Sequence, residues 1–437
     1  MLPAALLLTS LSASPTPDAV AKELTPLYLQ LHQAPELAGQ EAKTAATLAT
    51  RVKALGVPVI EHLGGHGLVA VLQNGPGRTV LVRTDLDALP LEEKTGLPYA
   101  SKVTTKDATG RPVSVMHACG HDVHMTSWLG ALTLLARSRA EWKGTVVFVA
   151  QPAEETGEGA KALLADKLLE RIPHPDAAVA LHVHAELPSG QVGVLPGYAL
   201  ANVDSVDVTF FGKGGHGAYP HTAVDPILLA SRFVVGVQAL VAREQSPFDP
   251  AVVTVGSFHA GTRPNIIPDQ ATLQLTLRSY TPKTREALRA GVERFARAEA
   301  DAARAPRPPT VTVTPGPSAV FNDPLLAERL SHALASALGP SRLATVERVM
   351  GAEDFSEYGA RGGFPSVMIW LGTVEPARFE KAKASGEPLP ALHSPFFAPD
   401  RDRTLATGVR ALHAATLELL REAPPGATAP PAAAPSR

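Results

Sequence analysis

The single cysteine of this 437-residue chain, Cys119, lies in the segment MHACGHD among side chains that can hold a metal ion. His117 and His121 stand two residues to either side of it, and His124 follows one helical turn later. One cysteine cannot close an intramolecular disulfide, so its neighbours must account for it. Because thiolate and imidazole groups bind borderline-soft divalent cations, this spacing indicates a metal site at Cys119 and His121.

More carboxylates and imidazoles follow short strand-like runs elsewhere in the chain. These residues are, in chain order, Asp85, Asp87, Glu154, Glu155, His182, His184 and His393. In open α/β sheets, ligands bind beyond the carboxyl ends of the strands, so we expect these groups to meet at one rim of a sheet. Together with Cys119 and His121 they supply enough ligands for two divalent cations.

The adjacent pair Glu154 and Glu155 distinguishes a catalytic site from a purely structural one. Neighbouring side chains at a strand end diverge, so one carboxylate can hold a cation while the other faces water as a general base. The alternative is a solvated helix N-terminus, where carboxylates interact favourably with the helix dipole. The pair follows QPA at the end of the apolar run TVVFVA, which favours the catalytic interpretation.

Apolar runs and helical periodicity predict the elements that must position these residues. Buried strands are expected at 67–73, 79–85, 145–151, 177–184 and 365–372, and helices at 41–55, 124–137, 159–170 and 403–421. Strands that alternate with helices in this way predict an α/β fold, in which helices cover a sheet.

The middle of the chain follows a different pattern. Residues 202–314 form a β-α-β-β-α-β series whose strands alternate apolar and polar residues, as expected for a sheet with one face in water. We therefore predict a smaller, ferredoxin-like α+β domain, inserted into a catalytic domain made of residues 21–201 and 315–422.

The two ends of the chain carry little globular signal. Residues 1–20 have a short apolar stretch followed by small residues and prolines, as in a secretory signal, although no basic residue precedes the apolar stretch. We expect export, periplasmic or secreted, if this is a signal peptide, and a cytoplasmic location otherwise. Residues 423–437 predict a disordered tail. No later segment reaches about 18 uninterrupted apolar residues, so no membrane span is expected.

The composition argues against nucleic acid as a partner. The formal net charge is -2, and no dense block of Lys and Arg would attract phosphates locally. Hydrophobic residues make up 45% of the chain and charged residues 19%, which is usual for a globular protein, and the length predicts two domains.

Nine segments, in order, resemble the motifs of the metal-dependent aminoacylase and carboxypeptidase family, most closely its hippurate hydrolase and auxin-conjugate amidohydrolase branch. They are LHQAPELAGQE, VRTDLDALP, MHACGHDVHM, TVVFVAQPAEETGEGA, ALHVHAELPSG, GKGGHGAYPH, AVVTVGSFHAGTRPNIIPD, GAEDFS and LHSPFF. The resemblance implies a mixed-sheet, di-metal aminopeptidase-like catalytic domain with an inserted lid or dimerisation domain. It also implies hydrolysis of N-acyl amino acids to a carboxylic acid and a free amino acid.

Carried over position by position, the resemblance implies a ligand set and a general base. The ligands would be Cys119, His121, Glu155, His182 and His393, which would hold two divalent cations, zinc or manganese. Glu154 would take a proton from the attacking water. Asp85 and Asp87 stand where other branches place a ligand and a residue that orients the base.

The resemblance assigns three more residues, all in the inserted domain. In dimeric relatives the histidine equivalent to His216, in GKGGHG, reaches the partner's active site and stabilises the oxyanion, which implies a homodimer formed through this domain. Asn265, in RPNIIPD, and Arg278, in LTLRSY, resemble positions that bind the substrate carboxylate. Arg278 could equally be an exposed arginine on the wet face of the sheet.

Two other classes of protein compete with this interpretation. A cysteine hydrolase that pairs Cys119 with a histidine would also explain the single cysteine, but it leaves the two glutamates and the distant histidines without a role. A non-catalytic descendant that binds amino-acid conjugates would be expected to lack Glu154 or a ligand, and the chain keeps them all.

Overall fold

The computed structural model describes residues 15–421, and the chain divides into two compact units. Unit 1 consists of Met1–Val194, Leu325–Val346 and Val367–Arg437, and unit 2 of Leu195–Pro324 and Glu347–Ser366. The predicted tail at 423–437 and most of the predicted segment at 1–20 lie outside the described residues. Each unit has its own hydrophobic core.

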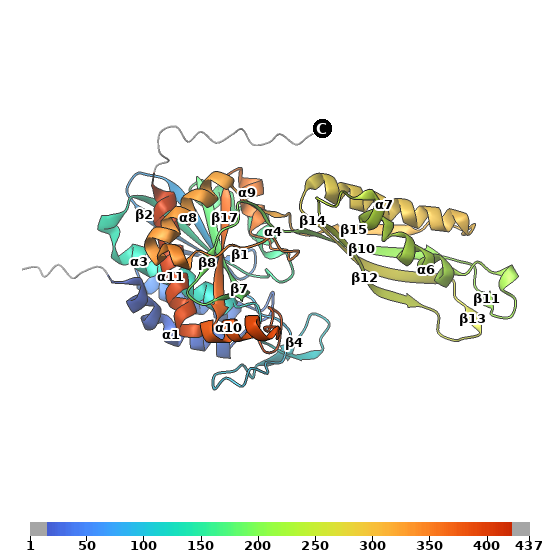
Figure 1. Cartoon of the computed structure of the whole chain (residues 1–437), viewed down its shortest axis with the longest axis horizontal. Helices are drawn as coiled ribbons and strands as arrows, with labels where there is room; N and C mark the ends of the chain where they lie inside the picture. Colours follow the sequence, from blue (N-terminus) through green and yellow to red (C-terminus); the bar gives the residue numbers. More distant parts are fainter. Residues whose placement is uncertain (1–14, 422–437) are drawn as a thin grey trace, which may run out of the picture. The chain divides into compact units, whose positions relative to one another are not determined.

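A seven-stranded mixed sheet forms the centre of unit 1 (Figure 1). In sheet order its strands are β1 (Val59–Leu63), β2 (Gly67–Asn74), β6 (Gly144–Gln151), β3 (Thr79–Asp85), β7 (Ala177–Pro188), β17 (Ser366–Val374) and β8 (Val192–Gly193). β3 runs parallel to β6 and β7, whereas β2 runs antiparallel to β1 and β6. Every residue of β3 and β17 is buried, as expected for apolar strands covered on both faces. The predicted α/β class with a mixed sheet is confirmed.

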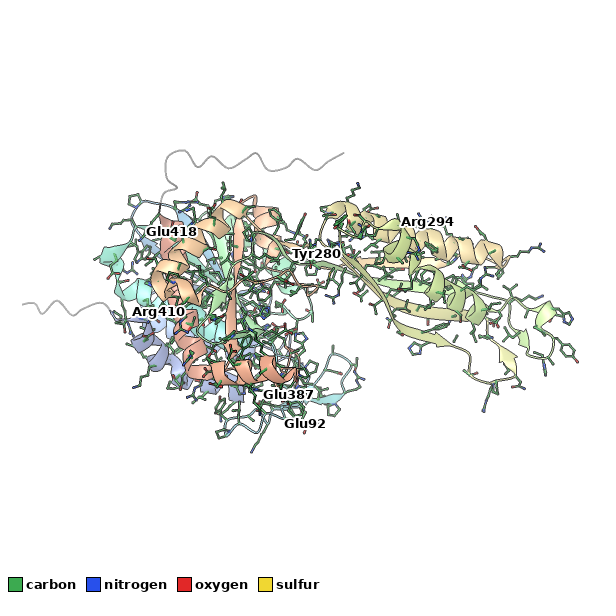
Figure 2. All side chains as sticks on the ribbon, viewed as in Figure 1. Glu92, Tyr280, Arg294, Glu387, Arg410 and Glu418 are labelled. Atoms are coloured by element: carbon green, nitrogen blue, oxygen red, sulfur yellow. The ribbon has the colours of Figure 1, made fainter. Side chains whose placement is uncertain are left out.

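Helices pack around this sheet and against one another. The helices of unit 1 are α1 (Pro17–Gln33), α2 (Ala42–Ala54), α3 (His121–Arg137), α4 (Gly159–Ala165), α5 (Leu168–Arg171), α8 (Pro324–Leu338), α10 (Pro376–Ser385) and α11 (Arg401–Leu420). α1, α3 and α11 contact each other, and α3 and α11 lie against β3. Arg410 and Glu418 of α11, labelled in Figure 2, form ion pairs with Asp18 of α1 and Arg329 of α8.

Two helical regions differ from the sequence prediction. The helix expected at 159–170 is broken into α4 and α5, because Lys167 adopts φ +61° between them. No helix is predicted at the position of α1, yet Thr16 caps it by accepting the N–H of Ala19, and a proline occupies its first turn. Its buried residues, among them Val20, join the core of unit 1.

Unit 2 contains the predicted β-α-β-β-α-β series. Its members are β10 (Asn202–Phe211), α6 (Pro226–Gly236), β12 (Ala251–Ala260), β14 (Gln270–Ser279), α7 (Pro282–Ala302) and β15 (Thr310–Pro315). The strands form an antiparallel sheet in the order β12-β14-β10-β15, an arrangement typical of ferredoxin-like folds. Side chains along β10 and β14 alternate in burial, as their period of two predicts.

The first helix of this series, α6, ends at Gly236, and a π-helical turn follows at Leu240–Glu244. By length and hydropathy alone, one segment of the described residues, Pro226–Glu244, passes the test for a membrane span. Three of its side chains, Leu229, Phe233 and Leu240, pack in the core of unit 2, so the segment serves as a core helix there.

Short elements complete the two units. In unit 1, β4 (Thr104–Lys106) pairs with β5 (Pro112–Ser114). In unit 2, β9 (Gly197–Leu200) pairs with β16 (Val320–Asn322), β11 (Gly215–His216) pairs with β13 (Ile266–Ile267), and α9 covers Ser356–Gly362.

Candidate metal centre

The predicted ligands of unit 1 come together beyond the carboxyl ends of the central strands. Glu154 and Glu155 lie in the turn that follows β6. Cys119 lies in the loop before α3, and His121 is the first residue of that helix. His182 lies within β7, which continues beyond it, whereas the sequence pattern places it at the strand end. β7 is longer than predicted, and its ligand projects from the strand itself.

These side chains form overlapping groups whose ligand atoms lie within 4.8 Å of one another. The groups are Cys119 with His121 and His182, Cys119 with Glu155 and His393, and His121 with Glu154 and Glu155. The Sγ atom of Cys119 lies 3.7 Å from Nε2 of His182. Glu155 Oε2 lies 3.4 Å from His393 Nε2. Because Cys119 belongs to two groups, one thiolate can reach two neighbouring cations.

The donor set fits divalent cations. His121 Nε2 and Glu155 Oε1 are buried and have no hydrogen-bond partner within the described structure. Burying unpaired polar atoms costs free energy, so these two atoms indicate a ligand between them. The Nδ1 atoms of His121 and His182 lie 2.8 Å from the carbonyl oxygens of Asp87 and Val183, respectively. Each Nδ1–H can donate there, which leaves both Nε2 lone pairs for a metal.

Asp87 holds the turn that carries the two glutamates. This fully buried carboxylate accepts the N–H of Glu154 through Oδ1 at 3.1 Å and the N–H of Glu155 through Oδ2 at 2.9 Å. The preceding residue, Ala153, adopts φ +54°, and its N–H donates to Glu41 Oε1 at 2.8 Å. Asp87 therefore positions the proposed base through the backbone.

Two loops around the thiol are held in unusual conformations. Gly120 adopts φ +75°, and a Cβ there would lie 2.7 Å from a methyl group of Val183, so a larger residue would not fit. His393 adopts φ +64°, which is uncommon for a residue with a Cβ. Its N–H donates to the carbonyl of Ala118 at 2.9 Å, which joins the His393 loop to the cysteine loop. Its side chain is 54% exposed.

The charges at the site also suit a cation. Burial lowers the pKa of His182 well below its usual range, so this imidazole is neutral. Burial raises the pKa of Glu155 to about 7; His121 opposes this rise, and neighbouring carboxylates add to it. Burial lowers the pKa of His121, but Asp85 and the hydrogen bond to Asp87 outweigh burial and raise it to about 10. The same negative potential that favours a proton on His121 favours a divalent cation.

A buried ion-pair network that was not predicted from the sequence lies next to His121, at the start of α3. His32 of α1 lies 2.7 Å from Asp122 and 3.2 Å from Glu93. Burial lowers the pKa of His32, but these two carboxylates outweigh burial and raise it to about 10. His117, whose two ring nitrogens are buried and have no hydrogen-bond partner among residues 15–421, has its pKa lowered by burial to about 4. In the sequence, the only feature that could have indicated this role for His32 is its place among the apolar residues that form the buried face of α1.

The remaining predicted site residues lie in unit 2, in two separate places. His216 is on β11, and the N–H of the next residue donates to the carbonyl of Asn265 at 2.8 Å, so these two predicted residues are neighbours. Asn265 precedes the first residue of β14, whereas Arg278 lies near the last. The guanidinium of Arg278 donates to the carbonyl of Met350 at 2.7 Å. At ~3.3 Å per residue, about 25 Å of strand separates it from the loop that carries Asn265. Within one copy of unit 2, Asn265 and Arg278 therefore cannot bind the same carboxylate.

Residues 81–416 match the profile of peptidase family M20/M25/M40. The chain belongs to this family. Among its relatives, N-acetyldiaminopimelate deacetylase of Listeria innocua serovar 6a is 35% identical over 367 residues, covering 83% of this chain and 94% of the relative. N-acetylcysteine deacetylase of Bacillus subtilis is 36% identical over 349 residues, covering 78% of this chain and 86% of the relative.

A solved structure of the same family agrees with the fold. The YXEP protein of Bacillus subtilis, described as a dinuclear metal binding peptidase, is 31% identical, with a TM-score of 0.74. The alignment covers 92% of this chain and 99% of that protein. The predicted family is confirmed, and this M20 protein is a metal-dependent amide hydrolase. The hippurate and auxin-conjugate branch stays a prediction.

Proposed function

We propose that this M20 protein hydrolyses the amide bond of N-acyl amino acids, using two divalent cations. The observation that carries the proposal is that the two ligand groups share Cys119, with Glu154 beside them in the third group. Relatives named as deacetylases of N-acetyldiaminopimelate and of N-acetylcysteine support the substrate class. Both names describe an acyl group joined to an amino acid.

The ligand assignment follows from the groups. The residues that would hold the cations are Cys119, His121, Glu155, His182 and His393. Cys119 is the residue shared by the group that contains His182 and the group that contains His393, so its thiolate would help to hold the cations at both. A thiolate and three imidazoles favour zinc, while the carboxylate also suits manganese.

The chemistry divides between the metal and the protein. Two divalent cations would polarise the scissile carbonyl and lower the pKa of a water molecule. Glu154, held in place by Asp87, takes the proton from the attacking water and delivers it to the departing amine. From the family resemblance, we assign His216 the role of donating a hydrogen bond to the oxyanion. Its Nδ1 accepts the N–H of Ala218 at 3.0 Å, so Nε2 carries the proton that is donated.

We further propose that the active form is a homodimer made through unit 2. β12 is an edge strand of ten residues, which offers unpaired backbone groups to another strand. Large apolar side chains are exposed beside it, including Leu228 and Val235 of α6. A second copy would also let Asn265 of one chain and Arg278 of the other serve one active site. Sedimentation of wild type and of a Leu228→Asp, Val235→Asp double variant tests this proposal, and a monomeric wild type with full activity contradicts it.

A hydrolysis panel tests the proposed function. The substrates are N-acetyl, N-benzoyl, N-indoleacetyl and N-fatty-acyl amino acids, and release of the free amino acid is measured with metal-depleted and reconstituted enzyme. We expect release that requires the cation and is lost in Glu154→Gln. Release that survives metal depletion would favour a thiol hydrolase built on the Cys119 and His182 pair, and no release from any substrate would favour a binding protein.

A further inference from the structure

His124 has no part in the proposed ligand set, although it lies among the ligands. Its ring centroid is 4.7 Å from that of His182 and 5.2 Å from that of His121. With Asp85 and His121 it also forms a group that could hold a cation, because the ligand atoms lie within 4.8 Å. The contacts of its two nitrogens decide between a third metal position and another role.

Both ring nitrogens of His124 are engaged by the protein. Nδ1 lies 2.7 Å from Oδ1 of Asp85, and Nε2 accepts the N–H of Val183 at 2.9 Å. An acceptor at Nε2 must carry a lone pair, so the ring is the neutral tautomer with its proton on Nδ1, which donates to Asp85. Neither nitrogen is left to coordinate a cation.

The anchor beneath His124 is a buried charge network. Asp85 is fully buried, and its Oδ2 accepts a hydrogen bond from Arg83 at 2.7 Å. Arg83, also buried, donates through Nε to Gln151 at 3.0 Å. These residues come from β3 and β6, whereas Val183 is on β7, so the chain of bonds crosses three neighbouring strands. Asp85 is therefore hydrogen-bonded to both Arg83 and His124, and its Oδ2 also lies 3.8 Å from Nε2 of His121.

At Val183 this series of hydrogen bonds reaches a proposed metal ligand, His182. Val183 gives its N–H to His124, and its carbonyl lies 2.8 Å from Nδ1 of His182. That contact turns Nε2 of His182 toward the thiol of Cys119 at 3.7 Å. One residue, Val183, thus links the His124 ring to the orientation of His182.

We propose that His124, anchored by Asp85, is a positioning residue that sets the orientation of His182 through the backbone of Val183, and that the Asp85 and His124 pair binds no cation. The inference rests on the proposed function, since it concerns a ligand of that site. Outer-shell partners of this kind change metal affinity by about 10- to 100-fold when they are removed.

Two substitutions separate the two hydrogen bonds of His124. The amide of His124→Asn can replace Nδ1 and keep the bond to Asp85, whereas the amide of His124→Gln can replace Nε2 and keep the bond to Val183. We expect zinc affinity, measured by competition with a chromophoric chelator, to fall about 10- to 100-fold in His124→Asn and several-fold less in His124→Gln. Both variants should still bind two ions per chain at saturating zinc.

Controls and contrary outcomes follow from the same contacts. His413→Gln changes a histidine on α11 of the same unit and should leave zinc affinity unchanged. Equal affinity in wild type and His124→Asn, equal loss in both His124 variants, or loss of one whole ion would each overturn the inference. If His124→Asn does not fold, a crystal structure of zinc-loaded wild type decides, because an ion ~2.1 Å from either His124 nitrogen contradicts it. A wild type that binds neither zinc nor manganese refutes the proposed function instead.

Discussion

Asp87→Asn is the substitution for which the structure makes the sharpest quantitative prediction. The native carboxylate accepts two N–H groups, those of Glu154 and Glu155, at 3.1 and 2.9 Å. The asparagine amide can accept only one of them and turns an NH₂ group toward the other. A lost hydrogen bond to a charged group costs ~1.5 to 3 kcal/mol. If this loss misplaces the base and raises the activation free energy by the same amount, kcat/KM drops about 10- to 150-fold.

The assay compares this variant with a carboxylate at the opposite end of the same strand. Asp176 Oδ2 accepts the N–H of Thr79 at 2.7 Å, where β3 begins and Asp87 is about 20 Å away. Release of the amino acid and thermal unfolding are measured for Asp87→Asn and Asp176→Asn. We expect both variants to unfold more readily, but only Asp87→Asn to lose kcat/KM. Equal activity in the two variants would refute the reasoning that Asp87 positions the glutamates.

Three further predictions concern single side chains. Glu154→Gln should keep its metal content and lose kcat by about 10²- to 10⁴-fold, measured with metal-reconstituted enzyme; a loss below tenfold would exclude a general base. His32→Gln should be less stable than wild type in urea below about pH 6.5, and the difference should vanish toward pH 10, because the pKa of His32 is raised to about 10 on folding. A difference that grows with pH would contradict that ion pairing. Asp204→Ala removes a buried carboxylate paired with two partly exposed arginines, and should cost unit 2 about 3 kcal/mol in chemical unfolding, whereas a cost below 1 kcal/mol would place little stability there.

Residues with a periodic or buried pattern were predictable from the chain alone. The run at 79–85 contains the apolar residues Val80, Leu81 and Val82, and it forms β3 with the predicted bounds. The alternating strands of unit 2 were also predictable, because a half-buried sheet imposes a period of two on the apolar residues of its strands. The predicted ligands do converge, since strand ends of one sheet share a rim.

Features that depend on contacts distant in sequence were not predictable. The partners of His124 lie 39 and 59 residues away, so nothing near it in sequence indicates that both nitrogens are occupied. A charged residue within an apolar strand is a weak indication that Arg83 has a buried partner. Nothing in the sequence, however, shows that Asp85 binds Arg83 and not a metal ion. The separation of Asn265 from Arg278 follows from the register of β14, which motif order does not contain.

The central claim is that two divalent cations, held by residues of unit 1, activate water for amide hydrolysis. The most direct test is to titrate metal-depleted enzyme with zinc or manganese while counting bound ions by mass spectrometry and measuring amino-acid release. We predict that activity rises to its maximum as two ions bind per chain. Full activity in enzyme that holds no metal would contradict the claim.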